Sequence, residues 1–324
     1  MKTKAAYFLL LIMAMGQVSR AQDREGFASF YIGGWDLHIV SPKSYYPTYL
    51  ADPHAIRFDL SSQKILFSNI DNQDEVNNNG SYMGKLTIKP ANRLTLLRLA
   101  PASNPRLGIE VDVGVALPFT MRRGNHDLIA FDGIFHMAIS GAPTEWLSLR
   151  LAKHHYCSHR GVEYWAGKTN SPVDFDPGLF NLYVRDDFVL SAAFRPLYFT
   201  GIRQLDILQI YIDLNTYIPG YGVTGMRQNR PNTHAKYIFQ GGAELEYYFE
   251  RSFLGGVFTA LNVSAWQENG YSPNYSAIAG YIFPQKISSK KLRIGVNYYN
   301  GRCINNEFYN YKERFLAFHI AFDL

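Results

Sequence analysis

The middle of the chain alternates apolar and polar residues with a period of two, and no other feature limits its possible folds as much. Between positions 109 and 120, one set of alternate residues is Ile, Val, Leu or Phe, while the other set contains Glu110, Asp112 and Thr120. The same alternation recurs around 208–215 and 237–249. Successive side chains of a β-strand point to opposite faces, so each segment is expected to be a strand with one dry and one wet face.

The length of these strands favours a membrane. They run for about ten to thirteen residues, whereas strands of soluble proteins usually have about five or six. Lipid admits only helices or closed barrels, and after the N-terminal segment no apolar run is long enough for a membrane helix. The sequence therefore predicts an all-β, transmembrane antiparallel β-barrel. Alternation and turn residues give about twelve strands, at 56–68, 81–99, 107–119, 127–140, 145–157, 186–199, 205–218, 236–250, 255–266, 275–284, 290–300 and 314–324.

The N-terminus is typical of an export signal. A charged start is followed by an apolar run of about a dozen residues and by Ser19-Arg20-Ala21. We expect residues 1–21 to be a signal peptide that is cleaved after Ala21, residues 22–55 to be a periplasmic N-terminal arm or plug, and residues 56–324 to form the barrel. The expected location is the outer membrane of a Gram-negative cell.

Removal of this segment lowers the formal net charge. It takes away Lys2, Lys4 and Arg20, so the charge falls from +5 to +2. The rest of the chain has no cluster of basic residues interleaved with stacking aromatics, so we expect no nucleic-acid partner.

The last residues alternate up to the carboxyl end. Leu316, Phe318, Ile320, Phe322 and Leu324 share one face. This pattern resembles the terminal recognition signal of bacterial outer-membrane barrels, which usually ends in Phe. The resemblance implies that the barrel-assembly machinery recognises the C-terminal strand. If that strand ends in the periplasm, the long polar links at 69–80, 157–185, 221–235 and 300–312 face the cell exterior.

The densest group of reactive side chains follows the fifth expected strand. If the alternation continues, His155, Cys157 and His159 point toward lipid, while His154 and Ser158 point inward. A His beside a Ser or Cys is the basis of acyl hydrolysis, because the imidazole takes the proton of the nucleophile.

His155-x-Cys157 resembles the lipid-facing His-x-Ser of outer-membrane phospholipases and lipid A deacylases. The resemblance implies an acyl hydrolase of phospholipid or lipopolysaccharide at the outer leaflet, with His155 as base and Cys157 or Ser158 as nucleophile. His159 and Glu163 complete the candidate catalytic group. No Asn or acid is assigned to orient the base, although four loop residues are available: Asn170, Asp174, Asp176 and Asn181. The alternative is an interfacial polar cluster that binds the following loop to the barrel rim.

Charged residues are also expected inside the barrel. The predicted polar network of the lumen consists of Glu110, Asp112, Asp132, Arg150, Asp213, Glu244 and Arg293. Eight strands close around side chains alone and sixteen leave a channel, so about twelve predict a narrow or plugged lumen. The two cysteines, Cys157 and Cys303, lack metal-type spacing, and we expect no metal or cofactor. Export would permit a disulfide, but their spacing does not decide whether they pair.

Two motifs together suggest a family. Leu50-Ala51-Asp52-Pro53 precedes the first strand, and His155-x-x-Ser158-His159-x-Gly161-x-Glu163 follows the fifth. This combination resembles the bacterial family called domain of unknown function 1207, which implies an outer-membrane-like barrel of unassigned activity.

Three functional hypotheses follow from these features. The first is a monomeric outer-membrane barrel with a structural role or a role in handling small solutes or lipids. The second is the lipid acyl hydrolase, and the third is a narrow selective pore.

Overall fold

The computed structural model describes eight segments of the chain: 26–68, 84–123, 126–161, 183–200, 208–218, 236–284, 291–309 and 311–322. The expected signal peptide, Glu163, the four loop residues available to orient the base and the last two residues lie outside these segments. Among the described residues, no helix is long and apolar enough to cross a membrane.

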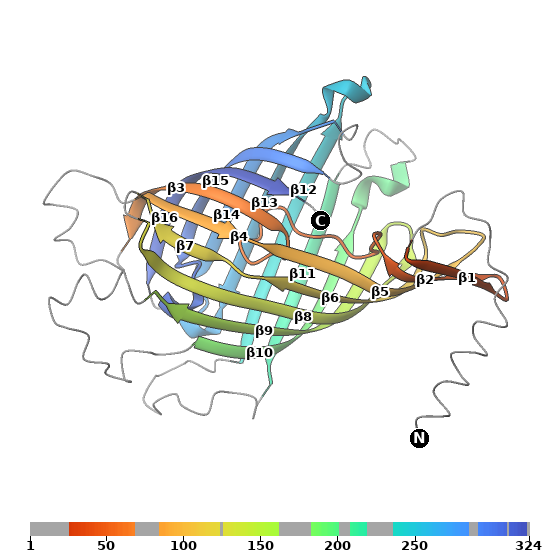
Figure 1. Cartoon of the computed structure of the whole chain (residues 1–324), viewed down its shortest axis with the longest axis horizontal. Coiled ribbons are helices and arrows are strands. Elements are labelled where there is room, and N and C mark those ends of the chain that lie inside the picture. The colour runs from red at the N-terminus through yellow and green to blue at the C-terminus, as the bar shows by residue number, and fades with distance from the viewer. Residues whose placement is uncertain are drawn as a thin grey trace, which may run out of the picture.

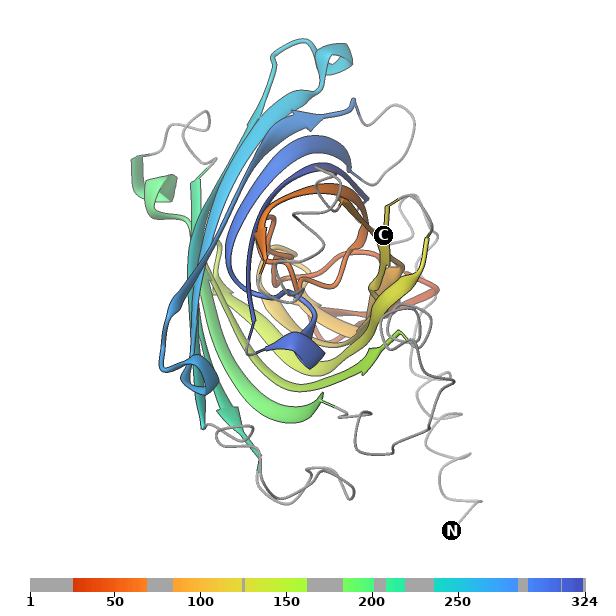
Figure 2. The same cartoon turned by 90° about the vertical axis from the view of Figure 1, so that its left-hand side faces the viewer.

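Twelve antiparallel strand positions close into a barrel (Figures 1 and 2), which confirms the predicted fold class. Pairing of β16 with β3 and of β8 with β9 completes the ring. The positions are β3 (Phe58–Ser68), β4 (Gly84–Lys89) continued by β5 (Ala91–Pro101), β6 (Gly108–Ala116) continued by β7 (Phe119–Arg122), β8 (Leu128–Thr144), β9 (Leu147–Arg160), β10 (Tyr183–Phe194), β11 (Leu208–Tyr217), β12 (Tyr237–Tyr248), β13 (Gly256–Trp266), β14 (Pro273–Ile282), β15 (Leu292–Arg302) and β16 (Lys312–Phe322).

Two prolines interrupt neighbouring strands at the same level of the barrel. Pro90 separates β4 from β5, and Pro118 lies between β6 and β7. Proline has no N–H for the ladder, so each strand is broken there. β4 pairs with β3, whereas β5 pairs with β2 (Trp35–Ser41). Along the β4–β5 position, the neighbouring strand is therefore β3 on the β4 side of Pro90 and β2, from the N-terminal part of the chain, on the β5 side.

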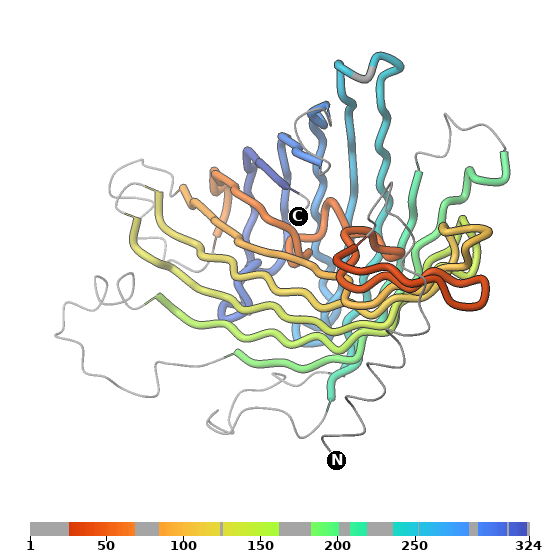
Figure 3. Tube along the Cα trace, turned by 45° about the vertical axis from the view of Figure 1, so that its right-hand side comes forward, coloured from red at the N-terminus to blue at the C-terminus, as the bar shows by residue number. Residues whose placement is uncertain are grey.

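β2 forms a hairpin with β1 (Ala28–Ile32), which the sequence pattern did not predict. Gly33 and Gly34 turn the chain with φ values of +55° and +89°, a conformation that favours glycine. Figures 1 and 3 show the hairpin beside β5, at the end of the barrel opposite the outer tips of β7 and β16. We call this the short-turn end, because tight links such as residues 145–146 lie there, and the other the long-loop end.

The outer surface of the barrel is apolar. Phe135, Met137, Leu151 and Leu190 are each at least 40 % exposed, and they occupy the outward positions of neighbouring strands. The inward positions hold buried polar groups such as Asp112. This distribution is the reverse of that in a soluble protein and is the one a barrel in hydrocarbon requires.

Two segments of chain fill the inside. Residues 42–57, which we call the plug, cross the lumen between β2 and β3 (Figure 2). At the long-loop end, residues 303–309 fold inward around a short 3-10 turn, η5 (Asn306–Phe308), and we call them the cap. The sequence reading placed this link outside, but Asn306 and Glu307 are at most 2 % exposed. Among the described residues, three further 3-10 turns lie at strand ends: η1 (Pro196–Thr200), η3 (Ser252–Leu254) and η4 (Gln267–Asn269).

Candidate functional site

The plug is held by side chains of the barrel wall that bind its main chain. Glu110 accepts hydrogen bonds from the Ser44 hydroxyl at 2.5 Å and from the Tyr45 amide at 2.8 Å. The Arg93 guanidinium donates to the carbonyl of Tyr46 at 2.6 Å. Because an unpaired buried main-chain group is costly, these contacts fix the course of the plug rather than merely filling space.

Asp112 links several of these wall side chains. Its carboxylate accepts hydrogen bonds from Arg93 at 2.9 Å, His136 at 2.7 Å, Arg150 at 3.2 Å and Ser140 at 3.3 Å. A carboxylate with two guanidinium partners is well compensated for its burial. The network therefore keeps Arg93 oriented toward the plug.

The next part of the plug binds the opposite wall. Glu244 accepts a hydrogen bond from the Leu50 amide. The hydroxyl of Tyr49 donates to Asp213 at 2.7 Å, and its ring stacks on Tyr211 with centroids 3.5 Å apart. The plug is thus held on both sides of the lumen.

The tip of the plug meets the cap. The His54 ring donates from Nε2 to the carbonyl oxygen of Ile304 at 2.9 Å and lies near the rings of Tyr156 and Trp266. Burial lowers the pKa of His54 below its usual value of 6.5, so the neutral form is favoured in this position. Through this contact the two inward segments support each other.

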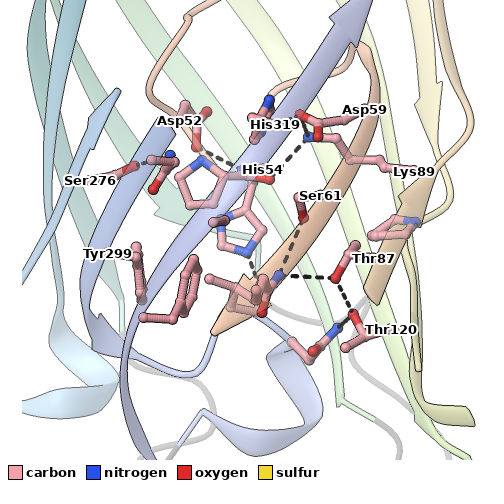
Figure 4. Close-up of a pocket in the computed structure, with 18 of the residues that line it drawn as sticks. Asp52, His54, Asp59, Ser61, Thr87, Lys89, Thr120, Ser276, Tyr299 and His319 are labelled. Atoms are coloured by element: carbon pink, nitrogen blue, oxygen red, sulfur yellow. Dashed lines mark hydrogen bonds and ion pairs between the residues drawn. The ribbon is translucent and has the colours of Figure 1, made fainter. Parts of the chain in front are cut away.

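A small polar cavity lies beside the tip (Figure 4). Its volume is about 50 Å³, which is room for a few water molecules. Figure 4 shows Lys89, Asp59 and His319 on one side, where His319 lies 2.9 Å from Asp59, and a chain of hydrogen bonds through Thr87 and Thr120 on the other. A second cavity, on the other side of the plug, measures about 60 Å³. Neither matches the several hundred Å³ of a typical ligand pocket.

The cap is held by residues of β8, β9 and β10. Glu307 accepts hydrogen bonds from Arg160 at 3.1 Å and from the Tyr183 amide at 3.0 Å, while its own amide donates to the Ser158 hydroxyl at 2.9 Å. Ser158 in turn donates to Asp132. Ser158 is therefore engaged inside the barrel, where lipid does not reach it.

All seven lumen residues expected from the sequence point inward. Six of them bind the plug, the cap or one another; Asp132 does so by accepting a hydrogen bond from the Asn306 amide of the cap at 3.3 Å. The seventh, Arg293, donates to Glu246 at 2.5 Å. The sequence did not indicate that most of these charged side chains contact the plug, the cap or each other instead of solvent.

The candidate catalytic residues divide between the two faces of β9. His155, Cys157 and His159 are on the outer face, and Ser158 is on the inner face. His159 packs against Phe131 with ring centroids 6.3 Å apart. Glu163 lies outside the described residues. The structure thus brings His155 and Cys157 to one surface and leaves Ser158 out of it.

Asp186 of β10 supplies an acid that the sequence reading did not assign. It lies directly opposite His155 in the strand register, and its Oδ1 is 3.2 Å from His155 Nδ1. Lys153 Nζ is 3.5 Å from the same oxygen. The Asp186 side chain is only 6 % exposed, although it lies on the outer face. The alternation along β10 predicts which face Asp186 occupies. Its pairing with His155 also depends on the register between β9 and β10, which the sequence does not give.

Cys157 lies two positions beyond His155 on the same face. Its sulfur fills the space above Gly133, where an added Cβ would come within 2.7 Å of Sγ and 2.9 Å of the Phe135 ring. The Phe135 and His155 rings have centroids 5.9 Å apart. We call His155, Cys157 and Asp186 the outer-face group. Both cysteines are free thiols, and the described residues hold no group of three or more His, Cys, Asp or Glu side chains suited to a metal.

The closed antiparallel ring, the apolar outside and the filled, polar inside together define a transmembrane β-barrel of the outer-membrane type. Residues 204–324 match the model of a family described as "Protein of unknown function (DUF1207)". This match, over little more than a third of the chain, agrees with the family that the sequence suggested, although both motifs that suggested it precede the matched range. No curated protein matches the chain.

Several solved structures are similar in fold. The KdgM porin is 7 % identical and aligns over 83 % of this chain and 99 % of its own, with a TM-score of 0.40. The outer membrane phospholipase A from Escherichia coli is 10 % identical over 83 % of this chain and 92 % of its own, with a TM-score of 0.46. The Salmonella typhi outer membrane phospholipase is 11 % identical over 83 % and 91 %, with a TM-score of 0.41. Likenesses at this level say nothing about what this chain acts on.

Proposed function

We propose that the barrel is a lipid acyl hydrolase that acts at the outer leaflet through the outer-face group. The observation that carries this proposal is the hydrogen bond between His155 and Asp186 on the lipid-facing side, two positions from Cys157. A carboxylate on that face of a barrel is costly, so its presence beside a His points to a function.

The geometry assigns each residue a role. Nδ1 of His155 is occupied by Asp186, which leaves Nε2 to accept the proton of the Cys157 thiol. Residues two apart on one face of a strand are roughly 6–7 Å apart at their Cα atoms, a separation that both side chains can bridge by rotation. Asp186 orients the ring and stabilises its protonated form.

The reaction then takes two balanced steps. The Cys157 sulfur attacks the ester carbonyl carbon, the carbon–oxygen bond breaks, and His155 returns its proton to the leaving alkoxide, which gives an alcohol and a thioester. Water next attacks the thioester while His155 takes its proton. That proton returns to the sulfur, and the fatty acid leaves.

Purified protein in mixed vesicles tests the proposal, with fatty-acid release from phospholipid and from lipopolysaccharide measured by mass spectrometry. We expect release to fall by about 10²–10⁴-fold in His155→Ala, and to fall strongly in Cys157→Ala and Asp186→Asn. His159→Ala is the matched control: the sequence placed His159 in the candidate catalytic group, but in the structure its ring packs on Phe131 and it is not part of the outer-face group. Heat-modifiable gel migration verifies that each variant is folded. Folded wild-type protein without release from either lipid, or full release by Cys157→Ala, would refute the hydrolase.

The plug supports a second candidate, a conduit for small solutes that opens only when residues 42–57 move. Its support is that wall side chains hold the plug by hydrogen bonds, which water can replace. Planar-bilayer recording tests it: wild-type protein should be silent, and a variant lacking residues 43–54 should give single-channel steps. Silence of that variant, once folded, would exclude the conduit.

Location and export remain part of the proposal. We infer insertion into the outer membrane through the barrel-assembly machinery after cleavage behind Ala21. N-terminal sequencing of the protein from an outer-membrane fraction checks both points, and recovery as a soluble periplasmic protein would contradict them.

A further inference from the structure

The N-terminal hairpin has two chemically different faces. On β2, Leu37 and Ile39 lie on one face, while His38 and Ser41 lie buried on the other. His38 accepts or donates a hydrogen bond with the Ser29 hydroxyl of β1 at 2.8 Å. A hairpin free in water on both sides would have no need of a continuous apolar face.

That apolar face continues the lipid-facing surface of the barrel without interruption. The strand register aligns one apolar side chain from each of six successive strands into a single row, from β9 to β1. The row consists of Leu151, Ile139, Val111, Leu97, Ile39 and Ala28.

A second row reaches the hairpin one step farther toward the short-turn end. Ile109 faces Leu99, Leu99 faces Leu37, and Leu37 faces Phe30. Ile109 is 49 % exposed, like the other members of the lipid-facing belt. The hairpin therefore carries the same surface chemistry as the strands that lie in hydrocarbon.

The free edge of β1 limits how deep the hairpin can lie. Among the residues that the structure describes, β1 pairs with β2 on one side and has no neighbouring strand on the other. Unpaired main-chain groups cost several kcal/mol each in hydrocarbon, so this edge must reach the headgroup region. Tyr31 and Trp35, which flank the hairpin turn and are 50 % and 43 % exposed, are the residue types that favour that region.

We propose that the β1–β2 hairpin is a membrane-contacting flap whose apolar face rests on the lipid of the leaflet at the short-turn end. The occupant of this face is bilayer lipid, because the belt that it extends is already in contact with lipid. The proposal replaces a free periplasmic arm for residues 28–41 and is independent of the hydrolase.

Tryptophan fluorescence provides the test. The chain has four tryptophans, Trp35, Trp146, Trp165 and Trp266, so three can be changed to Phe to leave one. In vesicles of lipid brominated high on its acyl chains, a full-length variant retaining Trp35 should lose most of its emission. The control retains Trp266, which is buried in the lumen and should keep its emission.

Loss of Trp35 emission to a water-soluble quencher instead of to brominated lipid would overturn the proposal. A second measurement uses the unaltered chain, in bilayers that contain lipid with a photoreactive acyl group. Crosslinked lipid should be found on peptides from residues 26–41. Crosslinks confined to the barrel strands would overturn the proposal. Crosslinks from residues 26–41 to a second protein or to a second copy of the chain, instead of to lipid, would assign the apolar face to that partner.

Discussion

The contact between Glu110 and the plug allows a quantitative prediction. Glu110→Ala removes two short charge-assisted hydrogen bonds, from the Ser44 hydroxyl and from the Tyr45 amide, and a long one of 3.4 Å from the Tyr46 amide, which adds little. Such bonds contribute about 1.5–3 kcal/mol each to stability. Arg93 keeps its partner Asp112, so no cation is left unpaired, and the lower end of the range applies. We therefore expect the seated plug to be destabilised by about 3 kcal/mol relative to the released plug, which raises its opening constant roughly a hundredfold.

Hydrogen exchange measures that equilibrium directly. Amides that exchange only when the plug opens should exchange about a hundredfold faster in the variant, in the peptide that contains Tyr45. Glu145→Ala is the control, because Glu145 also binds an arginine, Arg106 at 2.8 Å, but at an exposed turn away from the plug. Unchanged exchange of the plug in folded Glu110→Ala protein would mean that the plug is held elsewhere and that this reasoning is wrong.

Three further predictions concern other parts of the barrel. Gly133→Ala would place a Cβ within 2.7 Å of Cys157 Sγ, so we expect a loss of about 1–3 kcal/mol in unfolding free energy together with impaired lipid hydrolysis, measured by thermal unfolding and the release assay. Burial lowers the pKa of His54, so the released plug binds a proton more readily than the seated one; the opening constant of the plug, obtained from exchange corrected for the intrinsic pH dependence of amide exchange, should rise as the pH falls below 6.5, and His54→Gln should flatten that dependence. A membrane-permeant maleimide should label Cys157 on the outer face of the folded protein, and Cys303, which is fully buried, only after unfolding, as mass spectrometry of the two peptides would show.

The barrel strands were readable from the sequence because lipid imposes a strict alternation on them. A one-residue shift would turn a whole strand inside out, so the pattern of Ile109 to Thr120 fixes both the strand and its faces. The hairpin of β1 and β2 follows the same alternation around Gly33-Gly34. It escaped prediction because five to seven residues are too few to distinguish a strand from an extended arm.

Parity separates the two neighbouring tyrosines of β15. Tyr299 is buried inside the barrel, whereas Tyr298 is exposed on the outside. Adjacent residues of a strand face opposite sides, so one member of such a pair must point into the lumen. The pairing of Asp186 with His155 was out of reach for a related reason, because register between two strands is set by the loop joining them and by contacts far away in the sequence.

The filled lumen follows from the strand number. Eight strands can close around their own side chains, but twelve enclose more space than wall residues fill, so additional chain has to enter. That chain brings main-chain amides and carbonyls into a closed interior, and each needs a partner. The inward charges meet this need: Glu110 and Glu244 bind amides of the plug, and Arg93 binds a carbonyl. Solute passage would require these bonds to break, whereas lipid reaches His155 and Cys157 with the plug in place. The resting structure therefore favours chemistry on the outer face over conduction through the inside.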